Sequence, residues 1–237
     1  MELLAWSPPG GGATLGVGLG NTILIALGAY ALGLTIGVAG AFGKLYGGPI
    51  TRDLLAIYTT LVRAVPELVL LLLITFAAKD AINAVLRSWK FAPIDFSGVT
   101  AGIIVLGVVQ GAYSTEVLRG AILSVPAGQI EAGRAMGMSP FKIARRITLP
   151  LAMSSAVPGL ANLWLNVTKD TALLAVIGFI ELTKATSLAA ATTKEFLTFY
   201  LAAGVLYLAL SLVSGVIFGR IEKWARKGQR NARGGAM

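Results

Sequence analysis

The chain has 237 residues, of which 56% are hydrophobic and only 13% are Asp, Glu, Lys or Arg, yet its net charge is +9. Soluble domains contain about 25% charged residues, so this composition excludes an ordinary solvated globule, and its apolarity excludes a disordered chain. The sequence has no cysteine and no histidine, which excludes disulfides, thiolate metal sites and histidine-dependent acid–base chemistry.

Five apolar stretches have about the length needed to cross a bilayer as helices, which is roughly 20 residues. They predict an all-α integral membrane protein with a single transmembrane domain over residues 1–237. The predicted spans are residues 13–43, 54–78, 98–115, 151–168 and 196–219. Arg63 and Glu67 interrupt the second span, and we expect Pro158 to bend or loosen the fourth.

Charge sets the expected orientation, because short cytoplasmic loops of membrane proteins are enriched in lysine and arginine. The most basic segments are the loop 125–150 and the C-terminal tail after residue 219. Both are cytoplasmic only if the chain crosses an odd number of times, which predicts a periplasmic N-terminus, a cytoplasmic C-terminus and a bacterial inner-membrane location. The apolar stretch 171–180 is too short to span, and we expect it to be re-entrant or interfacial.

Glycine is abundant, with 29 residues, and four pairs inside or near the predicted spans have a spacing of four. Small residues at this spacing let helix backbones approach closely in lipid. The pairs are Gly16/Gly20, Gly33/Gly37, Gly107/Gly111 and Gly215/Gly219. Together they predict a tightly packed bundle.

The basic loop between the third and fourth spans carries helix signals in both of its halves. Pro126 can begin a first helix, and Gly137 suits the left-handed position after its end. Ser139 and Pro140 are typical of an N-cap and a first helical position, so they predict a second helix, which we expect to end at Pro150. Two short helices that meet at a glycine would present a projecting surface to a cytoplasmic partner.

This loop resembles the EAA signature of permease subunits in bacterial ABC importers, which is Glu-Ala-Ala, three residues, Gly, nine residues, then Ile-x-Leu-Pro. The matching residues here are Glu131, Ala132, Gly133, Gly137, Ile147, Leu149 and Pro150. Gly133 stands where the family usually has alanine. The segments 59–73, 111–122 and 169–178 extend the resemblance to polar amino-acid uptake permeases, in particular the Q-type subunits of histidine, lysine/arginine/ornithine and opine importers.

The resemblance implies a five-span permease that passes polar, above all basic, amino acids or opines and couples to a separate ATPase. It implies three kinds of partner: a paralogous second permease, two ATP-binding subunits and a periplasmic substrate-binding protein. The EAA loop would be the coupling helix, so Glu131→Lys or Gly137→Asp should uncouple ATP hydrolysis from transport while membrane insertion survives. The sequence has no Walker A motif, so ATP and Mg would be bound by the partner ATPase, and we expect no catalytic residue, metal site or cofactor in this chain.

Polar side chains inside spans are costly, so they are candidates for the substrate path. The candidates are Arg63, Glu67, Gln110, Asn162, Asn166, Lys169 and Asp170. Arg63 and Glu67 lie one helical turn apart and can either contact substrate or neutralise each other near a helix end, where Pro66 indicates local irregularity. The other candidates can line the path or form hydrogen bonds between helices.

Glu116 and Arg119 are three residues apart at the cytoplasmic end of the third span, and they predict a structural ion pair. Two other classes of protein remain open at this point. One is an ion-coupled secondary transporter or channel subunit, which would be driven by protons or sodium without an ATPase. The other is a membrane scaffold that recruits a cytoplasmic partner and carries no substrate.

Overall fold

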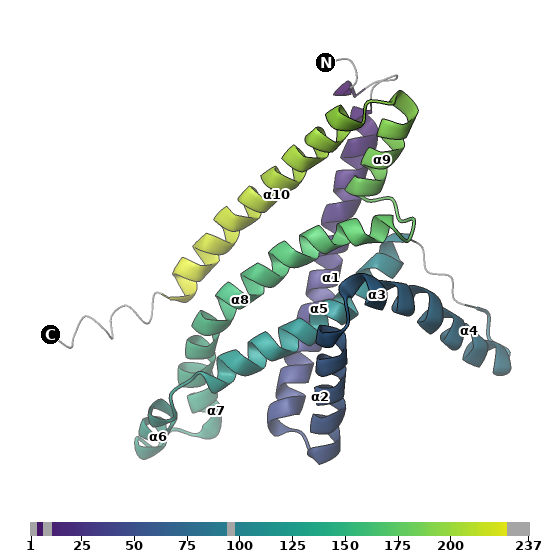
Figure 1. Cartoon of the computed structure of the whole chain (residues 1–237). Helices are drawn as coiled ribbons and strands as arrows, with labels where there is room; N and C mark the ends of the chain where they lie inside the picture. Colours follow the sequence, from purple (N-terminus) through teal and green to yellow (C-terminus); the bar gives the residue numbers. More distant parts are fainter. Residues whose placement is uncertain (1–3, 7–10, 94–97, 227–237) are drawn as a thin grey trace.

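The computed structural model describes residues 4–6, 11–93 and 98–226. Within these ranges the chain is almost entirely helical and contains no strand, which confirms the all-α prediction. The four long helices are α1 (Gly12–Tyr46), α5 (Gly98–Leu123), α8 (Leu149–Asp170) and α10 (Phe196–Ala225). In Figure 1, α1 and α10 run downward from the N-terminal end of the molecule, α5 runs downward from near its middle, and α8 runs upward.

The predicted span 54–78 is wrong, because this stretch does not form one helix. Its first part belongs to α2 (Pro49–Ala64), and a new helix begins only after Val65 and Pro66. Val65 is extended, with φ −94° and ψ 139°, as expected for a residue before proline. Pro66 has no N–H with which to continue the helix, so the chain changes direction here.

The segment after the break starts with α3 (Glu67–Leu72) and continues through a π-helical turn, Leu73–Ala78, into α4 (Lys79–Ser88). The apolar helical stretch in this part of the chain therefore covers 67–88 instead of 54–78. Figure 1 shows α4 directed away from the rest of the bundle.

Four helical stretches among the described residues are long and apolar enough to cross a membrane: Gly12–Tyr46, Glu67–Ser88, Gly98–Leu123 and Phe196–Ala225. The predicted fourth span, 151–168, coincides with α8, whose 22 residues also give sufficient length. α8 falls outside the apolar set because polar residues, including Asn162, Asn166 and Lys169, lower its hydropathy.

The tightest helix contact is the seam between α1 and α5, where glycines replace side chains. A Cβ at Gly33 would lie 2.8 Å from the Cβ of Gln110, and one at Gly107 would lie 2.6 Å from the Cδ2 of Leu32. Gly37 is similarly pressed against Ser114. Two of the four predicted glycine pairs, 33/37 and 107/111, therefore make close helix contacts, as expected for packing in lipid.

The remaining glycine positions differ. A Cβ at Gly16 would meet the ring of Trp6, whereas Gly20, Gly215 and Gly219 face open space within this chain.

Polar side chains join the long helices across their apolar core. The Gln110 amide on α5 donates to the Leu163 carbonyl of α8 at 2.8 Å, and the Trp164 indole N–H donates to the Ser214 hydroxyl of α10 at 2.8 Å. Tyr30 on α1 packs edge-on against the Trp164 ring at 5.4 Å between centroids. These contacts fix α8 between α5 and α10.

The stretch 171–180 forms a short 3-10 helix, Thr171–Ala175, and a turn at Gly178, so it does not span, as predicted. A further helix, α9 (Leu182–Thr193), follows and was not expected from the sequence. The buried Glu181 carboxylate caps it by accepting from the N–H groups of Thr183 and Lys184, each at 2.8 Å. Glutamate is not among the usual N-cap residues, so α9 has no clear start signal in the sequence.

Candidate functional site

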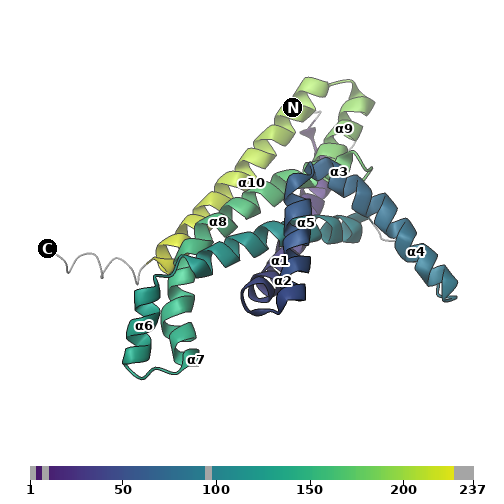
Figure 2. The same cartoon turned by 60° about the horizontal axis from the view of Figure 1, so that its bottom comes forward.

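The predicted cytoplasmic loop forms a projecting hairpin of two helices, α6 (Ala127–Ala135) and α7 (Pro140–Ile143), which Figure 2 shows clear of the long helices. Gly137 has φ +69°, so it occupies the left-handed position that the sequence predicted. Its N–H donates to the Arg134 carbonyl at 2.9 Å, and the next N–H donates to the Gly133 carbonyl at 3.0 Å. These bonds satisfy carbonyls at the end of α6 and close the turn.

Both helices of the hairpin begin at the predicted residues. Pro126 directly precedes α6 as its N-cap residue. Ser139 is the N-cap of α7, where its hydroxyl accepts from the Lys142 N–H at 3.4 Å, and Pro140 is the first helical residue. The two-helix prediction for this loop is therefore confirmed.

The expected end of the second helix at Pro150 is wrong. α7 passes into a π-helical turn, Ala144–Thr148, and from there directly into α8 without leaving helical conformation. The Leu149 N–H donates to the Ala144 carbonyl, five residues back. This wider turn accommodates a proline that lacks an N–H and would otherwise crowd the preceding carbonyls, so α7 and α8 form one continuous helix.

Some EAA residues are exposed to solvent or a partner, and others pack the two helices of the hairpin together. Glu131 and Ala132 are exposed, as are Leu149 and Pro150. Gly133 is buried, and a Cβ there would lie 2.8 Å from the Cδ1 of Ile147. Gly133 and Ile147 thus hold α6 against the following helix, while Glu131 and Ala132 face outward.

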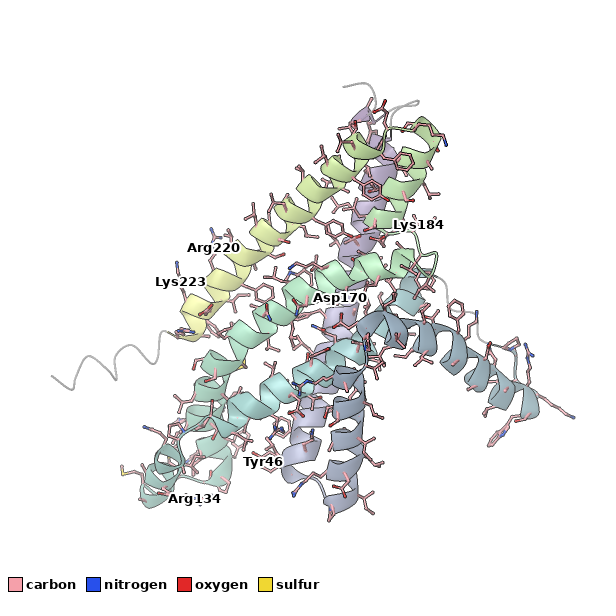
Figure 3. All side chains as sticks on the ribbon, in the orientation of Figure 1. Tyr46, Arg134, Asp170, Lys184, Arg220 and Lys223 are labelled. Atoms are coloured by element: carbon pink, nitrogen blue, oxygen red, sulfur yellow. The ribbon has the colours of Figure 1, made fainter. Side chains whose placement is uncertain are left out.

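Two large apolar side chains at the hairpin tip extend this surface. Met136 is 83% exposed and Phe141 is 73% exposed. Arg134, labelled in Figure 3, lies at the same end of the molecule. Exposed apolar groups next to charges are typical of surfaces that bind another protein. Sequence reasoning missed Met136, because one methionine in a loop carries no distinguishing signal.

A second group of polar residues, which we call the polar cluster, consists of Arg63, Glu67, Tyr113, Lys169 and Asp170. The Glu67 carboxyl interacts with both the Tyr113 hydroxyl and the Asp170 carboxyl. Arg63 acts electrostatically on Tyr113, and Lys169 acts on Asp170. Side chains from α3, α5 and α8 therefore meet at Glu67, with Arg63 of α2 and Lys169 close enough to act on them electrostatically. Figure 3 shows Asp170 near the middle of the molecule.

The structure changes the expected relation between Arg63 and Glu67. Arg63 lies in the last turn of α2 and Glu67 in the first turn of α3, so the two do not share one helical face. Pro66 separates them and turns Glu67 toward Tyr113, a residue that sequence reasoning missed. The one signal for Tyr113 was its hydroxyl within a predicted span, and this signal was weak because Gln110, Ser114 and Thr115 are polar residues of the same span.

Three path candidates lie outside this cluster. Asn162 and Asn166 are exposed along α8, as is Lys169 of the cluster at the end of the same helix. Gln110 is only 3% exposed and its amide is used between α5 and α8, which is the interhelical role.

The predicted Glu116–Arg119 ion pair is confirmed and belongs to a larger group, which we call the Glu116 network. Arg119 donates to the Oε2 of Glu116 from Nε at 3.0 Å and from Nη2 at 2.9 Å. The Lys44 ammonium, on α1, lies 2.5 Å from the Oε1 of Glu116. The same ammonium donates to the Thr59 hydroxyl of α2 at 2.8 Å. The network therefore joins three helices.

A bundle of apolar helices with an EAA-type hairpin and a polar cluster between its helices defines a membrane permease. Residues 29–227 match the family described as "binding-protein-dependent transport system inner membrane component", and the chain belongs to this family. It is therefore an inner-membrane protein.

Curated relatives cover nearly the whole chain. The nopaline transport system permease protein of Agrobacterium fabrum is 38% identical over 98% of this chain and 99% of its own length. The histidine/lysine/arginine/ornithine transport system permease protein of Escherichia coli is 39% identical over 89% of this chain and 92% of its own.

Solved structures share the fold. An amino acid ABC transporter crystallised with histidines has a chain that aligns with a TM-score of 0.75 at 26% identity, over 89% of this chain and 94% of that one. The MetNI methionine ABC transporter, in an inward facing conformation, aligns with a TM-score of 0.71 at 20% identity, over 90% of this chain and 96% of that one.

Proposed function

We propose that this chain is a permease subunit of an ATP-driven importer that passes basic amino acids or opines across the inner membrane. The observation that carries this proposal is the exposed α6–α7 hairpin, which presents Glu131 beside Met136 and Phe141. A projecting, preformed surface of this kind suits docking to a soluble ATPase. That ATPase binds and hydrolyses ATP with Mg, whereas this chain provides the docking surface and the substrate path and hydrolyses nothing.

The proposed topology has five crossings, a periplasmic N-terminus and a cytoplasmic C-terminus. The broken α2–α3–α4 segment and α8 supply the two crossings that return from the cytoplasmic side. In Figure 3, Arg134 lies at the bottom of the molecule on the projecting hairpin, and Arg220 and Lys223 lie toward the C-terminal end of α10. We assign both places to the cytoplasmic side, in keeping with the excess of basic residues expected there.

The polar cluster supports a zwitterionic substrate that carries a further positive charge. Glu67 and Asp170 approach each other, and two neighbouring carboxylates favour a cation between them. Arg63 at the rim is complementary to the carboxylate of such a substrate. The names of the relatives, which include nopaline, histidine, lysine, arginine and ornithine transport, fit the same chemistry.

The proposed partners follow from the surfaces that this chain leaves open. Asn162, Asn166 and Lys169 form an exposed polar stripe on α8, and polar groups at membrane depth face protein or a water-filled path. We assign this stripe to the path between this chain and a second, paralogous permease. A periplasmic binding protein delivers the substrate, and two ATP-binding subunits complete the importer.

The test is reconstitution with the ATPase, the second permease and the binding protein, and measurement of ATP-driven uptake of labelled arginine together with ATP hydrolysis. Glu131→Lys should abolish stimulation of hydrolysis by the loaded binding protein and reduce uptake to background. Glu195→Lys is the matched control, because it makes the same charge change at an exposed carboxylate just before α10. Normal uptake by Glu131→Lys, or uptake driven by a proton or sodium gradient without ATP, would refute the proposal.

A further inference from the structure

The α6–α7 hairpin is joined through the chain to α5 on one side and to α8 on the other. α5 ends at Leu123, and only three residues separate it from α6. The buried Val125 anchors this link, and the Ser124 N–H donates back to the Gly120 carbonyl at 2.9 Å. A displacement of the hairpin therefore reaches α5 and α8 directly.

α2 has no such connection, although it carries Arg63 and leads into Glu67. Its polar link to α5 near the hairpin end runs through the Glu116 network. Glu116 binds the Lys44 ammonium at 2.5 Å, and that ammonium binds the Thr59 hydroxyl of α2 at 2.8 Å. Thr59 is only 2% exposed, so its hydroxyl is held in place inside the contact between α1, α2 and α5.

The Glu116 network and the polar cluster lie one helical turn apart on the same helices. On α5, Glu116 follows Tyr113 by three residues, and on α2, Thr59 precedes Arg63 by four. Residues three or four apart occupy the same face of a helix. Each helix therefore presents a residue of the network and, one turn further on, a residue of the cluster.

We propose that Glu116 is a positioning residue that couples the α6–α7 hairpin to the polar cluster, because it holds α2 to α5 through Lys44 and Thr59. This inference rests on the proposed function, since it assigns Glu116 a part in ATP-coupled transport. Removing the charge of Glu116 leaves the half-buried Lys44 ammonium without its counter-charge and frees it from the position in which it meets Thr59. α2 then keeps the hydrogen bond from its Tyr58 hydroxyl to the Val108 carbonyl of α5 but loses its polar link nearer the hairpin. Arg63 and Glu67 are then placed less firmly relative to Tyr113.

The test uses the full reconstituted importer and measures arginine transported per ATP hydrolysed, a ratio that does not depend on how much complex assembles. Glu116→Gln should lower this ratio about tenfold, within the roughly two- to thirtyfold range by which single residues alter coupling. Lys44→Gln should cause a similar loss, and the double variant should be no worse than either single one, because all three break the same link. Glu222→Gln is the matched control: it breaks the Glu222–Arg226 ion pair of 2.9 Å, which lies within α10 alone, and should leave the ratio unchanged.

An unchanged ratio in Glu116→Gln overturns the inference, and so does a double variant whose loss is the product of the two single losses. If Glu116→Gln does not assemble, Thr59→Val decides, because it keeps the side-chain volume and the ion pair and removes only the link to α2. An unchanged ratio in Thr59→Val then overturns the inference. Absence of ATP-driven uptake by the wild-type complex contradicts the proposed function itself.

Discussion

The α6–α7 hairpin and the polar cluster are built in opposite ways. The hairpin is one short chain segment whose shape is set by its own backbone, with Gly137 at φ +69° and Ser139 as an N-cap. The cluster has no local backbone of its own, since Arg63, Glu67, Tyr113 and Asp170 come from four different helices. The turn of the hairpin depends on contacts within one short segment, whereas the cluster exists only when four separate helices are correctly placed.

This difference indicates how a permease can change conformation in response to movements of an ATPase. A preformed surface is suited to receive force, because docking does not require it to be ordered first. A site assembled from separate helices is suited to change, because small helix movements alter its geometry. The following predictions test each half of this contrast, from the largest expected effect to the smallest.

Gly137→Val should remove ATP-driven uptake almost completely. A β-branched residue at φ +69° is strongly disfavoured, at a cost of at least about 1–2 kcal/mol, and the hairpin would lose its turn. Gly137→Asn is the control, because asparagine tolerates the left-handed region, and it should retain most uptake. Transport and ATP hydrolysis in proteoliposomes, normalised to membrane content, give the readout. Equal losses in both variants would show that the side chain, and not the backbone turn, matters.

Glu67→Gln should weaken uptake of arginine about tenfold and alter the preference between cationic and neutral substrates. Hydrogen bonds to charged groups contribute about 1.5–3 kcal/mol, and roughly 1.4 kcal/mol corresponds to tenfold. Competition of arginine uptake by a series of amino acids measures the effect. The exposed Glu195→Gln serves as the control. An unchanged rate and substrate profile in Glu67→Gln would remove the cluster from the substrate path.

Tyr113→Phe should have a smaller effect of the same kind, about two- to tenfold on the KM for arginine. It removes one hydroxyl next to Glu67 and keeps the ring, which corresponds to about 0.5–1.5 kcal/mol. Tyr200→Phe, at an exposed tyrosine of α10, is the matched control. If the two variants behave alike, Tyr113 does not belong to the working site.

Gly133→Ala should change transport least. The new methyl group would press on the Cδ1 of Ile147, the flexible end of a side chain, and would lie 3.2 Å from the Cγ1 of Ile143. Alanine improves helix propensity by about 1 kcal/mol, which offsets this crowding. We expect wild-type coupling and a thermal midpoint within a few degrees of wild type. Gly128→Ala is the control, because its exposed position has open space and the substitution changes only helix propensity. A large loss of uptake only in Gly133→Ala would mean that the hairpin packing is less tolerant than its geometry indicates.

The hairpin could be predicted in detail because its determinants are local. Pro126, Gly137 and Ser139 each act on the residues beside them, and each occupies the expected position. The path through Pro150 could not be predicted, since a π-helical turn has no simple residue signature and proline more often ends a helix.

The polar cluster could be predicted only in part. Arg63, Glu67 and Asp170 were identifiable one by one, because charges within apolar spans are rare. Their arrangement depends on how α2, α5 and α8 pack, and these helices are far apart in the sequence. The break at Pro66 was visible as a residue, but its consequence, that Glu67 turns toward Tyr113, needed the folded chain.

The π-helical turn at Ala144–Thr148 has a mechanical consequence. Because it carries the helix past Pro150, residues from Pro140 to Asp170 form one uninterrupted helix with a contour length of roughly 45 Å. One end of this helix lies in the hairpin, and the other end carries Asp170 of the polar cluster. A small rotation at the hairpin end becomes a larger displacement at Asp170. If the proposed function holds, this helix connects the ATPase-docking surface directly to the substrate path.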